Sequence, residues 1–183
     1  SYSDHRGHLG LRKILADECG LRPDQVLLTP GAAGALFFLS TSLLKQGDHI
    51  LVEHPNYGTN IETPRAMGVD VELFSVNFEK GFLPIPSEIF KRLKSNTKLV
   101  SLCLPHNPTG TQLPEETFRE LVLTLANKGI WVLVDETYRD MAFEKKLPSG
   151  ASLHPKVISV SSLSKTYGLP GIRVGWMLCQ DTG

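Results

Sequence analysis

Nearly continuous apolar stretches, each long enough for a buried β-strand, alternate with segments of helical periodicity along this chain. The clearest of these stretches lie at residues 49–53, 98–104, 130–134 and 157–160. A strand that is apolar on both faces has to be covered on both sides, which is typical of parallel sheets packed between helices. The sequence therefore predicts the α/β class, with a mostly parallel sheet flanked by helices on both faces.

The remaining elements follow from helical spacing and from turn residues. Helices are expected at residues 9–19, 31–44, 58–67, 86–93 and 114–129, with shorter strands at 26–28, 69–76 and 172–178. Pro114 is expected at the first helical position, where Glu115 and Glu116 complement the helix dipole. No internal repeat or linker interrupts the alternation, so residues 1–183 are predicted to form one domain.

The charge balance excludes one broad class of function. The 183 residues carry 19 Lys and Arg against 19 Asp and Glu, whereas a nucleic-acid or anionic-membrane binder normally has a basic excess. No apolar stretch is long enough to span a bilayer, and the first residues lack the apolar region of a signal peptide. Cys19, Cys103 and Cys179 are odd in number and widely spaced, which indicates reduced thiols. We expect a cytoplasmic protein with neither a nucleic acid nor a membrane as its partner.

Polar and glycine-rich loops follow the predicted strands. Ligands of open α/β sheets bind beyond the carboxyl ends of the strands, which is where these loops fall. The loops occupy residues 31–34, 54–58, 105–110, 135–138 and 161–165. Because the carboxyl ends of parallel strands lie at the same edge of a sheet, the sequence predicts that these loops form one site.

Several residues of these loops have both a chemical and a purely structural interpretation. Ala32 and Ala33 open a predicted helix, where free amides bind an anion such as phosphate, although a plain tight turn also fits. Asp135 ends a buried strand, so it needs a cationic partner unless it caps the next segment. Tyr138 lies one turn further on if the segment is helical, where it would face the same ligand or simply pack at the rim.

Lys165 is the candidate nucleophile. A lysine in a dry, concave site loses basicity and can attack a carbonyl carbon, whereas the alternative is an ordinary surface lysine. Arg173 is suited to binding a phosphate through two hydrogen bonds, or else to a surface ion pair. Tyr57 could stack on a flat ring or serve as a packing residue.

Two partial motifs point to other chemistries, and both fail. Residues 130–136 look like a Walker B strand, but the chain has no G-x-x-x-x-G-K-[ST] loop, which excludes that class of ATPase. Residues 162–165 fit the S-x-x-K motif of penicillin-binding serine enzymes, but the S-D-N and K-T-G elements that accompany it are missing.

Taken in this order, the motifs resemble those of the aminotransferase class I and II family, fold type I enzymes that use pyridoxal 5′-phosphate (PLP). The matching pieces are Tyr2-x-x-x-x-Gly7-x-x-x-Leu11-Arg12, Gly31-Ala32-Ala33, Pro55-Asn56-Tyr57, Asn107-Pro108-Thr109-Gly110, Asp135-Glu136-Thr137-Tyr138, and Ser162-Leu163-Ser164-Lys165 with Arg173-Val174-Gly175-Trp176. The resemblance extends over essentially the whole chain, and the last two pieces are specific.

The resemblance implies a role for each candidate residue. Lys165 would hold PLP as a Schiff base and then move a proton at the substrate Cα. Asp135 would pair with the pyridine nitrogen, which makes the ring an electron sink. Asn107 and Tyr138 would hydrogen-bond the phenolic oxygen of PLP, and Tyr57 would stack on the face of its ring. The phosphate would be bound by the Ala32 and Ala33 amides, Ser162 and Arg173. Tyr2 would contact the phosphate in the neighbouring subunit of a homodimer.

The chain departs from the family pattern in two places. Residues 31–34 are Gly-Ala-Ala-Gly, where many relatives offer a hydroxyl or amide side chain, so phosphate binding is expected to depend more on Ser162 and Arg173. Family members also continue beyond the strand that contains Trp176 into a small C-terminal domain, which usually carries the arginine that clamps the substrate carboxylate. The resemblance therefore implies that residues 1–183 are the PLP-binding large domain, with no second domain in this chain.

The activity implied by the resemblance is transamination between an amino acid and a 2-oxo acid. A PLP-dependent lyase, decarboxylase or cyclising synthase on the same fold is the nearest alternative, because these enzymes share the cofactor residues. A sensor domain that binds PLP without turnover is the alternative from a different class.

Overall fold

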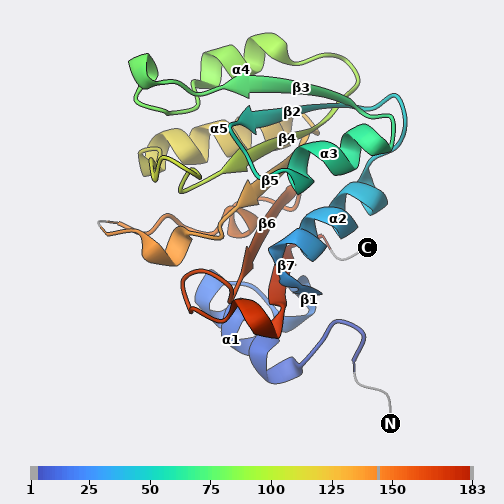
Figure 1. Ribbon diagram of the computed structural model, residues 1–183, viewed down its shortest axis with the longest axis vertical. Helices are drawn as coiled ribbons and strands as arrows, with labels where there is room; N and C mark the ends of the chain where they lie inside the picture. The colour runs from blue at the N-terminus through green and yellow to red at the C-terminus, as the bar shows by residue number, and fades with distance from the viewer. Residues whose placement is uncertain (1–3, 144, 182–183) are drawn as a thin grey trace.

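Seven strands form one sheet in the computed structural model, which describes residues 4–143 and 145–181 (Figure 1). The strand order is β1-β7-β6-β5-β4-β2-β3. The strands are β1 (Val26–Pro30), β2 (His49–His54), β3 (Asp70–Ser75), β4 (Thr97–Cys103), β5 (Trp131–Asp135), β6 (Val157–Ser162) and β7 (Val174–Cys179). Only β7 runs antiparallel to its neighbours, β1 and β6, and the other pairs are parallel. The predicted mostly parallel sheet is confirmed.

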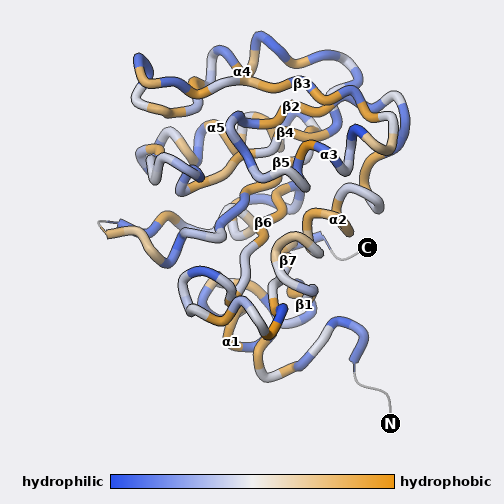
Figure 2. The backbone as a smooth tube through the Cα atoms, in the orientation of Figure 1, coloured by the Kyte–Doolittle hydropathy of each residue, from blue (hydrophilic) through white to orange (hydrophobic). Residues whose placement is uncertain are grey.

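Helices cover both faces of this sheet, as predicted. The helices are α1 (Leu9–Cys19), α2 (Gly31–Leu43), α3 (Thr59–Ala66), α4 (Pro86–Arg92) and α5 (Glu115–Asn127). Helices α2 and α3 lie on one side, and α4 and α5 on the other (Figure 1). Leu36 of α2 packs in a cluster with Val52 and Val160, whereas Leu121 of α5 belongs to a second cluster with Val132. Figure 2 shows the hydrophobic strands lying between these layers.

Element ends differ from the sequence prediction by a few residues, each for a local reason. Pro114 is the residue that precedes α5 rather than its first helical residue. Strand β1 continues to Pro30 because its last residues pair with β7. Strand β7 begins at Val174, since residues 170–172 form a short 3-10 turn and Arg173 has a φ of 52°.

All three cysteines are free, and none of the described helices is long and apolar enough to cross a membrane.

The register of the sheet brings the predicted loops to one edge. Cys103, at the end of β4, pairs with Asp135, at the end of β5. Asp135 pairs in turn with Val160 of β6. Ser162, at the end of β6, lies opposite Gly175 near the start of β7. The ends of three parallel strands and the beginning of the antiparallel one therefore adjoin.

Glu53, near the end of β2, is a buried carboxylic acid. Its side chain is fully buried, and Oε2 accepts a 2.6 Å hydrogen bond from the backbone N–H of Cys103. Oε1 has no hydrogen-bond partner in the part of the chain that the structure describes. Burial raises the pKa of Glu53 from its ordinary value near 4.5 to about 8. The folded protein therefore keeps the Glu53 proton at neutral pH.

We expect protein stability to fall as the pH rises from about 4.5 to about 8, with Glu53 as one cause. In this window the folded protein holds the Glu53 proton and the unfolded chain has released it, so folding takes up a proton and a higher pH opposes it. The contribution of Glu53 across the window is roughly 3–5 kcal/mol.

Urea unfolding of the wild type and of Glu53→Gln at the two ends of this window measures that contribution. The glutamine amide has no proton to lose, so the pH dependence of the unfolding free energy should be smaller in the variant. The same pH dependence in both proteins would show that Glu53 ionises at its ordinary pKa in the fold.

Candidate cofactor site

A pocket of about 210 Å³ lies among the loops that the sequence singled out. Nine of the ten predicted site residues line it, namely Ala32, Ala33, Tyr57, Asn107, Asp135, Tyr138, Ser162, Lys165 and Arg173. The tenth, Tyr2, lies outside the described residues. The lining comes from the first turn of α2, from the loops after β2, β4, β5 and β6, and from the residue before β7. Segments far apart in the sequence thus meet at one place.

Asp135 is a buried carboxylate at the end of β5. Its residue is 6% exposed, and Oδ1 accepts hydrogen bonds from the backbone N–H (3.0 Å) and the hydroxyl (2.6 Å) of Thr137. Within the described residues, Oδ2 accepts no hydrogen bond and no cation pairs with the carboxylate. Burial raises the pKa of Asp135, and the Thr137 hydrogen bonds act against this rise. A protonated ring nitrogen is the kind of partner that this oxygen lacks.

The first turn of α2 and Arg173 form a second part of the pocket, suited to an anion. Gly31 opens α2 with a φ of 74°, and a Cβ there would lie 2.6 Å from Nη2 of Arg173. A Cβ on Gly175 would lie 2.4 Å from the carbonyl carbon of Gly31, so only glycine allows this close approach. The first amides of a helix have no partner within the helix, and its dipole favours negative charge there. A phosphate would meet these amides and a guanidinium together.

The loop after β6 supplies the remaining polar groups. Ser162 is buried, and its hydroxyl accepts a 3.3 Å hydrogen bond from the backbone N–H of Ser164. Lys165 lines the pocket, but its side chain is exposed to solvent. The lysine is placed at the pocket without being desolvated there.

Two hydrogen-bonded loops present the predicted ring contacts. Asn56 Oδ1 accepts a 2.7 Å hydrogen bond from the backbone N–H of Tyr57, whose side chain is half exposed. His106 Nε2 donates to the carbonyl of Pro55 at 3.0 Å, which ties the loop carrying Asn107 to the loop carrying Tyr57. Burial lowers the pKa of His106 and so favours the neutral ring in this contact.

The sequence interpretation missed five pocket residues, namely Leu36, Cys103, Thr137, Ser164 and Pro170. Thr137 could have been anticipated in part, because an aspartate carboxylate in a turn often accepts a hydrogen bond from the backbone N–H two residues on. Cys103 could not have been anticipated, since nothing in the apolar stretch that forms β4 indicates that the side chain of its last residue lines a pocket. Tyr138 was expected one helical turn after Asp135, but it lies in a non-helical turn before the 3-10 segment Arg139–Met141.

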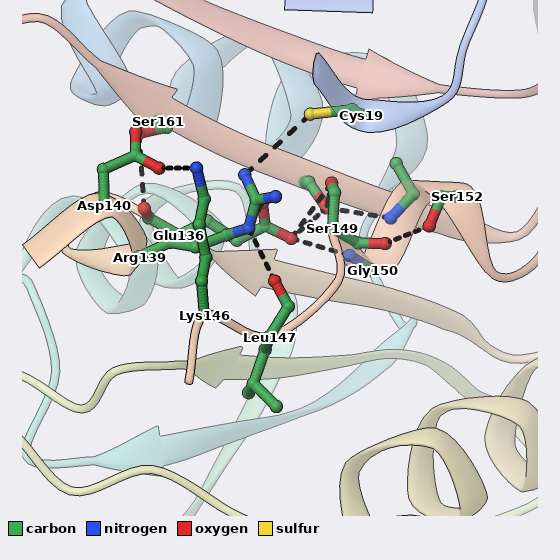
Figure 3. A network of polar contacts seen from close by, with 12 residues as sticks. Cys19, Glu136, Arg139, Asp140, Lys146, Leu147, Ser149, Gly150, Ser152 and Ser161 are labelled. Atoms are coloured by element: carbon green, nitrogen blue, oxygen red, sulfur yellow. Dashed lines mark hydrogen bonds and ion pairs between the residues drawn. The ribbon is translucent and has the colours of Figure 1, made fainter. Parts of the chain in front are cut away.

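A buried network around Glu136 fixes the strand ends that carry the site (Figure 3). Glu136 Oε1 accepts hydrogen bonds from Ser159 Oγ (2.6 Å), Gly150 N (2.7 Å) and Ser149 Oγ (3.2 Å). Ser161 Oγ donates to the backbone carbonyl of Glu136 at 3.3 Å. Because Glu136 adjoins Asp135 and Ser161 adjoins Ser162, these bonds hold the two site residues in register.

A larger pocket adjoins the first. It has a volume of about 910 Å³ and shares Asn107 and Tyr138 with the smaller pocket. The rest of its lining comes from residues between 105 and 115 and from residues 141–143, 145 and 147, including the exposed Met141 and Phe143. A ligand held in the smaller pocket would thus face open space beyond Asn107 and Tyr138.

Solved aminotransferases share this fold. A PLP-dependent aminotransferase from Streptococcus suis superposes with a TM-score of 0.91 at 34% sequence identity, and the match covers 98% of this chain and 48% of that one. Alanine aminotransferase from Pyrococcus furiosus gives a TM-score of 0.89 at 30% identity, covering 99% of this chain and 48% of that one.

The sequence comparisons agree. An arginine–pyruvate transaminase from Pseudomonas aeruginosa is 32% identical over 97% of this chain and 47% of the relative. The chain spans about half the length of the curated relatives it matches. The family and its fold imply PLP as the cofactor. The model of the family named aminotransferase class I and II matches residues 1–182, and the chain therefore belongs to that family.

Proposed function

We propose that residues 1–183 are the PLP-binding large domain of an aminotransferase that acts on an amino acid and a 2-oxo acid. The observation that carries this proposal is Asp135, a buried carboxylate in the same pocket as Lys165 and the Gly31–Arg173 anion site, whose Oδ2 has no partner among the residues that the structure describes. These three groups match the ring nitrogen, the aldehyde and the phosphate of PLP. When bound, PLP supplies an electron sink for the substrate Cα.

Each residue of the pocket has a task in this proposal. Lys165 Nζ binds the aldehyde carbon and moves a proton at the substrate Cα. Asp135 keeps the ring nitrogen protonated, while Tyr57 covers the ring face. Asn107 and Tyr138 donate hydrogen bonds to the phenolic oxygen. The amides of Ala32 and Ala33, the hydroxyl of Ser162 and the guanidinium of Arg173 bind the phosphate.

We further propose a homodimer, in which Tyr2 reaches the phosphate of the neighbouring subunit. Exposed apolar side chains on the two elements that build the anion site support it. Phe37 and Phe38 on α2 are 49% and 41% exposed, and Leu169 and Ile172 in the loop after Lys165 are 46% and 53% exposed. Apolar surface of this kind is typical of protein interfaces.

The three free cysteines favour a cytoplasmic location, where thiols stay reduced.

The named relatives favour transamination over the other PLP chemistries, since both an arginine–pyruvate transaminase and an alanine aminotransferase are among them. The test is to mix the PLP-loaded protein with a panel of amino acids and to measure two products, the 2-oxo acid and pyridoxamine phosphate. We expect both in equal amounts from at least one amino acid. Release of ammonia or carbon dioxide instead would indicate a lyase or a decarboxylase, and binding without any product would indicate a sensor.

A further inference from the structure

Thr137 donates both of the hydrogen bonds that the side-chain carboxylate of Asp135 accepts within the described residues. Its backbone N–H lies 3.0 Å from Asp135 Oδ1, and its hydroxyl oxygen lies 2.6 Å from the same atom. The second distance is in the range of a charge-assisted O–H···O⁻ hydrogen bond. Thr137 also lines the pocket itself. One residue, two positions after the aspartate, thus occupies one carboxylate oxygen completely and leaves the other to the pocket.

We propose that Thr137 is a positioning residue, which holds Oδ1 of Asp135 so that Oδ2 faces the ring nitrogen of the ligand. This inference rests on the proposed function, because PLP provides that nitrogen. Two bonds to one oxygen restrict rotation of the carboxylate about χ2, a torsion that is otherwise broad. The contribution of Thr137 is therefore the orientation of a group that is already in place.

No other side chain in the described part of the chain hydrogen-bonds the Asp135 carboxylate. The titratable groups that line the pocket with Asp135 are Cys103 on β4, Tyr57, Tyr138, Lys165 and Arg173. None of their side chains forms a hydrogen bond or an ion pair with the Asp135 carboxylate in the described part of the chain, although the Cys103 thiol on the neighbouring strand is close enough for the carboxylate charge to act on it. Glu136, the next residue, is engaged with Ser149, Gly150 and Ser159.

Removing the Thr137 hydroxyl has a second consequence for the carboxylate. Burial raises the pKa of Asp135, and the hydrogen bonds from Thr137 oppose that rise. Thr137→Val keeps the shape and the backbone N–H but removes the hydroxyl. Asp135 should then turn more freely and should take up a proton at a higher pH.

The first test follows Asp135 in the cofactor-free protein by carbon-13 NMR of its carboxyl group during a pH titration. We expect Thr137→Val to raise the pKa of Asp135 by about one pH unit, a tenfold change in proton affinity, because a hydrogen bond to a charged group is lost. Thr137→Ser, which keeps the hydroxyl, should restore the wild-type titration. A titration in Thr137→Val that is the same as in the wild type would overturn the inference.

The second test measures the binding of pyridoxine 5′-phosphate, which has the ring nitrogen and the phosphate of PLP but no aldehyde to react with Lys165. Thr137→Val is expected to weaken binding by roughly tenfold, and Thr137→Ser to bind like the wild type. If Thr137 acts through Asp135, Thr137→Val adds no further loss when it is combined with Asp135→Ala, because that variant leaves no side-chain oxygen for Thr137 to orient. An equal loss in both backgrounds would show that Thr137 only stabilises the turn, and would overturn the inference.

These outcomes separate the inference from the proposed function. A wild-type protein that binds neither PLP nor pyridoxine 5′-phosphate would overturn the proposed function, and the cofactor role of Thr137 with it. Binding by the wild type with no effect of Thr137→Val would overturn the inference alone.

Discussion

Lys165→Ala is expected to abolish covalent attachment of PLP and to slow amino transfer by roughly 10²–10⁴-fold, the usual contribution of a positioned acid–base group. Lys165 is the one lysine among the described residues that lines the smaller pocket. No second amine is therefore placed to bond the aldehyde carbon or to move the proton at the substrate Cα. The phosphate and ring contacts remain, so PLP should still bind noncovalently.

The visible absorption spectrum after PLP addition and gel filtration measures this effect. The wild type should retain the band of a lysine-linked cofactor, and Lys165→Ala should not. Lys94→Ala is the matched control, because Lys94 lies before β4 at the opposite edge of the sheet and pairs with Asp70 and Glu72. A retained band in Lys165→Ala that resists gel filtration as in the wild type would rule out the role given to this lysine.

Asp135→Asn is the variant with the second large effect, and it should change activity and stability in opposite directions. The asparagine can still accept the hydrogen bonds from Thr137, and Lys165 and the anion site remain, so PLP should stay bound. Without the carboxylate charge, the ring nitrogen loses its proton and the ring withdraws electrons less strongly. Proton removal from the substrate Cα is expected to slow by roughly 10²–10⁴-fold.

The same change removes a buried charge that has no cationic partner in the described residues. The cofactor-free protein should therefore gain stability at neutral pH, because an unpaired carboxylate costs more to remove from water than a neutral amide does. Single-turnover kinetics and urea unfolding measure the two effects on one protein. Near-normal proton removal in Asp135→Asn, or a loss of stability without the cofactor, would contradict the role given to Asp135.

The fold was predictable because burial is encoded in the periodicity of the sequence. Residues 130–134 are apolar on both faces of their strand, and that pattern alone indicated a covered parallel strand. The convergence of the loops followed from the same pattern, since parallel strands place their carboxyl ends at one edge. The pocket accordingly contains Asp135, Lys165 and Arg173, which lie on three different segments.

The details that were not predictable depend on side-chain geometry. The sequence does not state that Thr137 occupies one oxygen of Asp135 and leaves the other free, because that depends on the turn after β5. It does not show that Arg173 adopts a φ of 52° beside Gly31 either, because that conformation is set by contacts between distant segments. The sequence does not show how exposed the Lys165 side chain is, since solvent access depends on what surrounds the loop in three dimensions.

Borohydride reduction of the PLP-loaded protein, followed by peptide mapping, tests whether Lys165 binds the cofactor in the site that this chain builds. We expect one reduced cofactor per chain, attached at Lys165 in the peptide that also contains Ser162. Attachment at a different lysine, or spread over several surface lysines, would contradict this expectation.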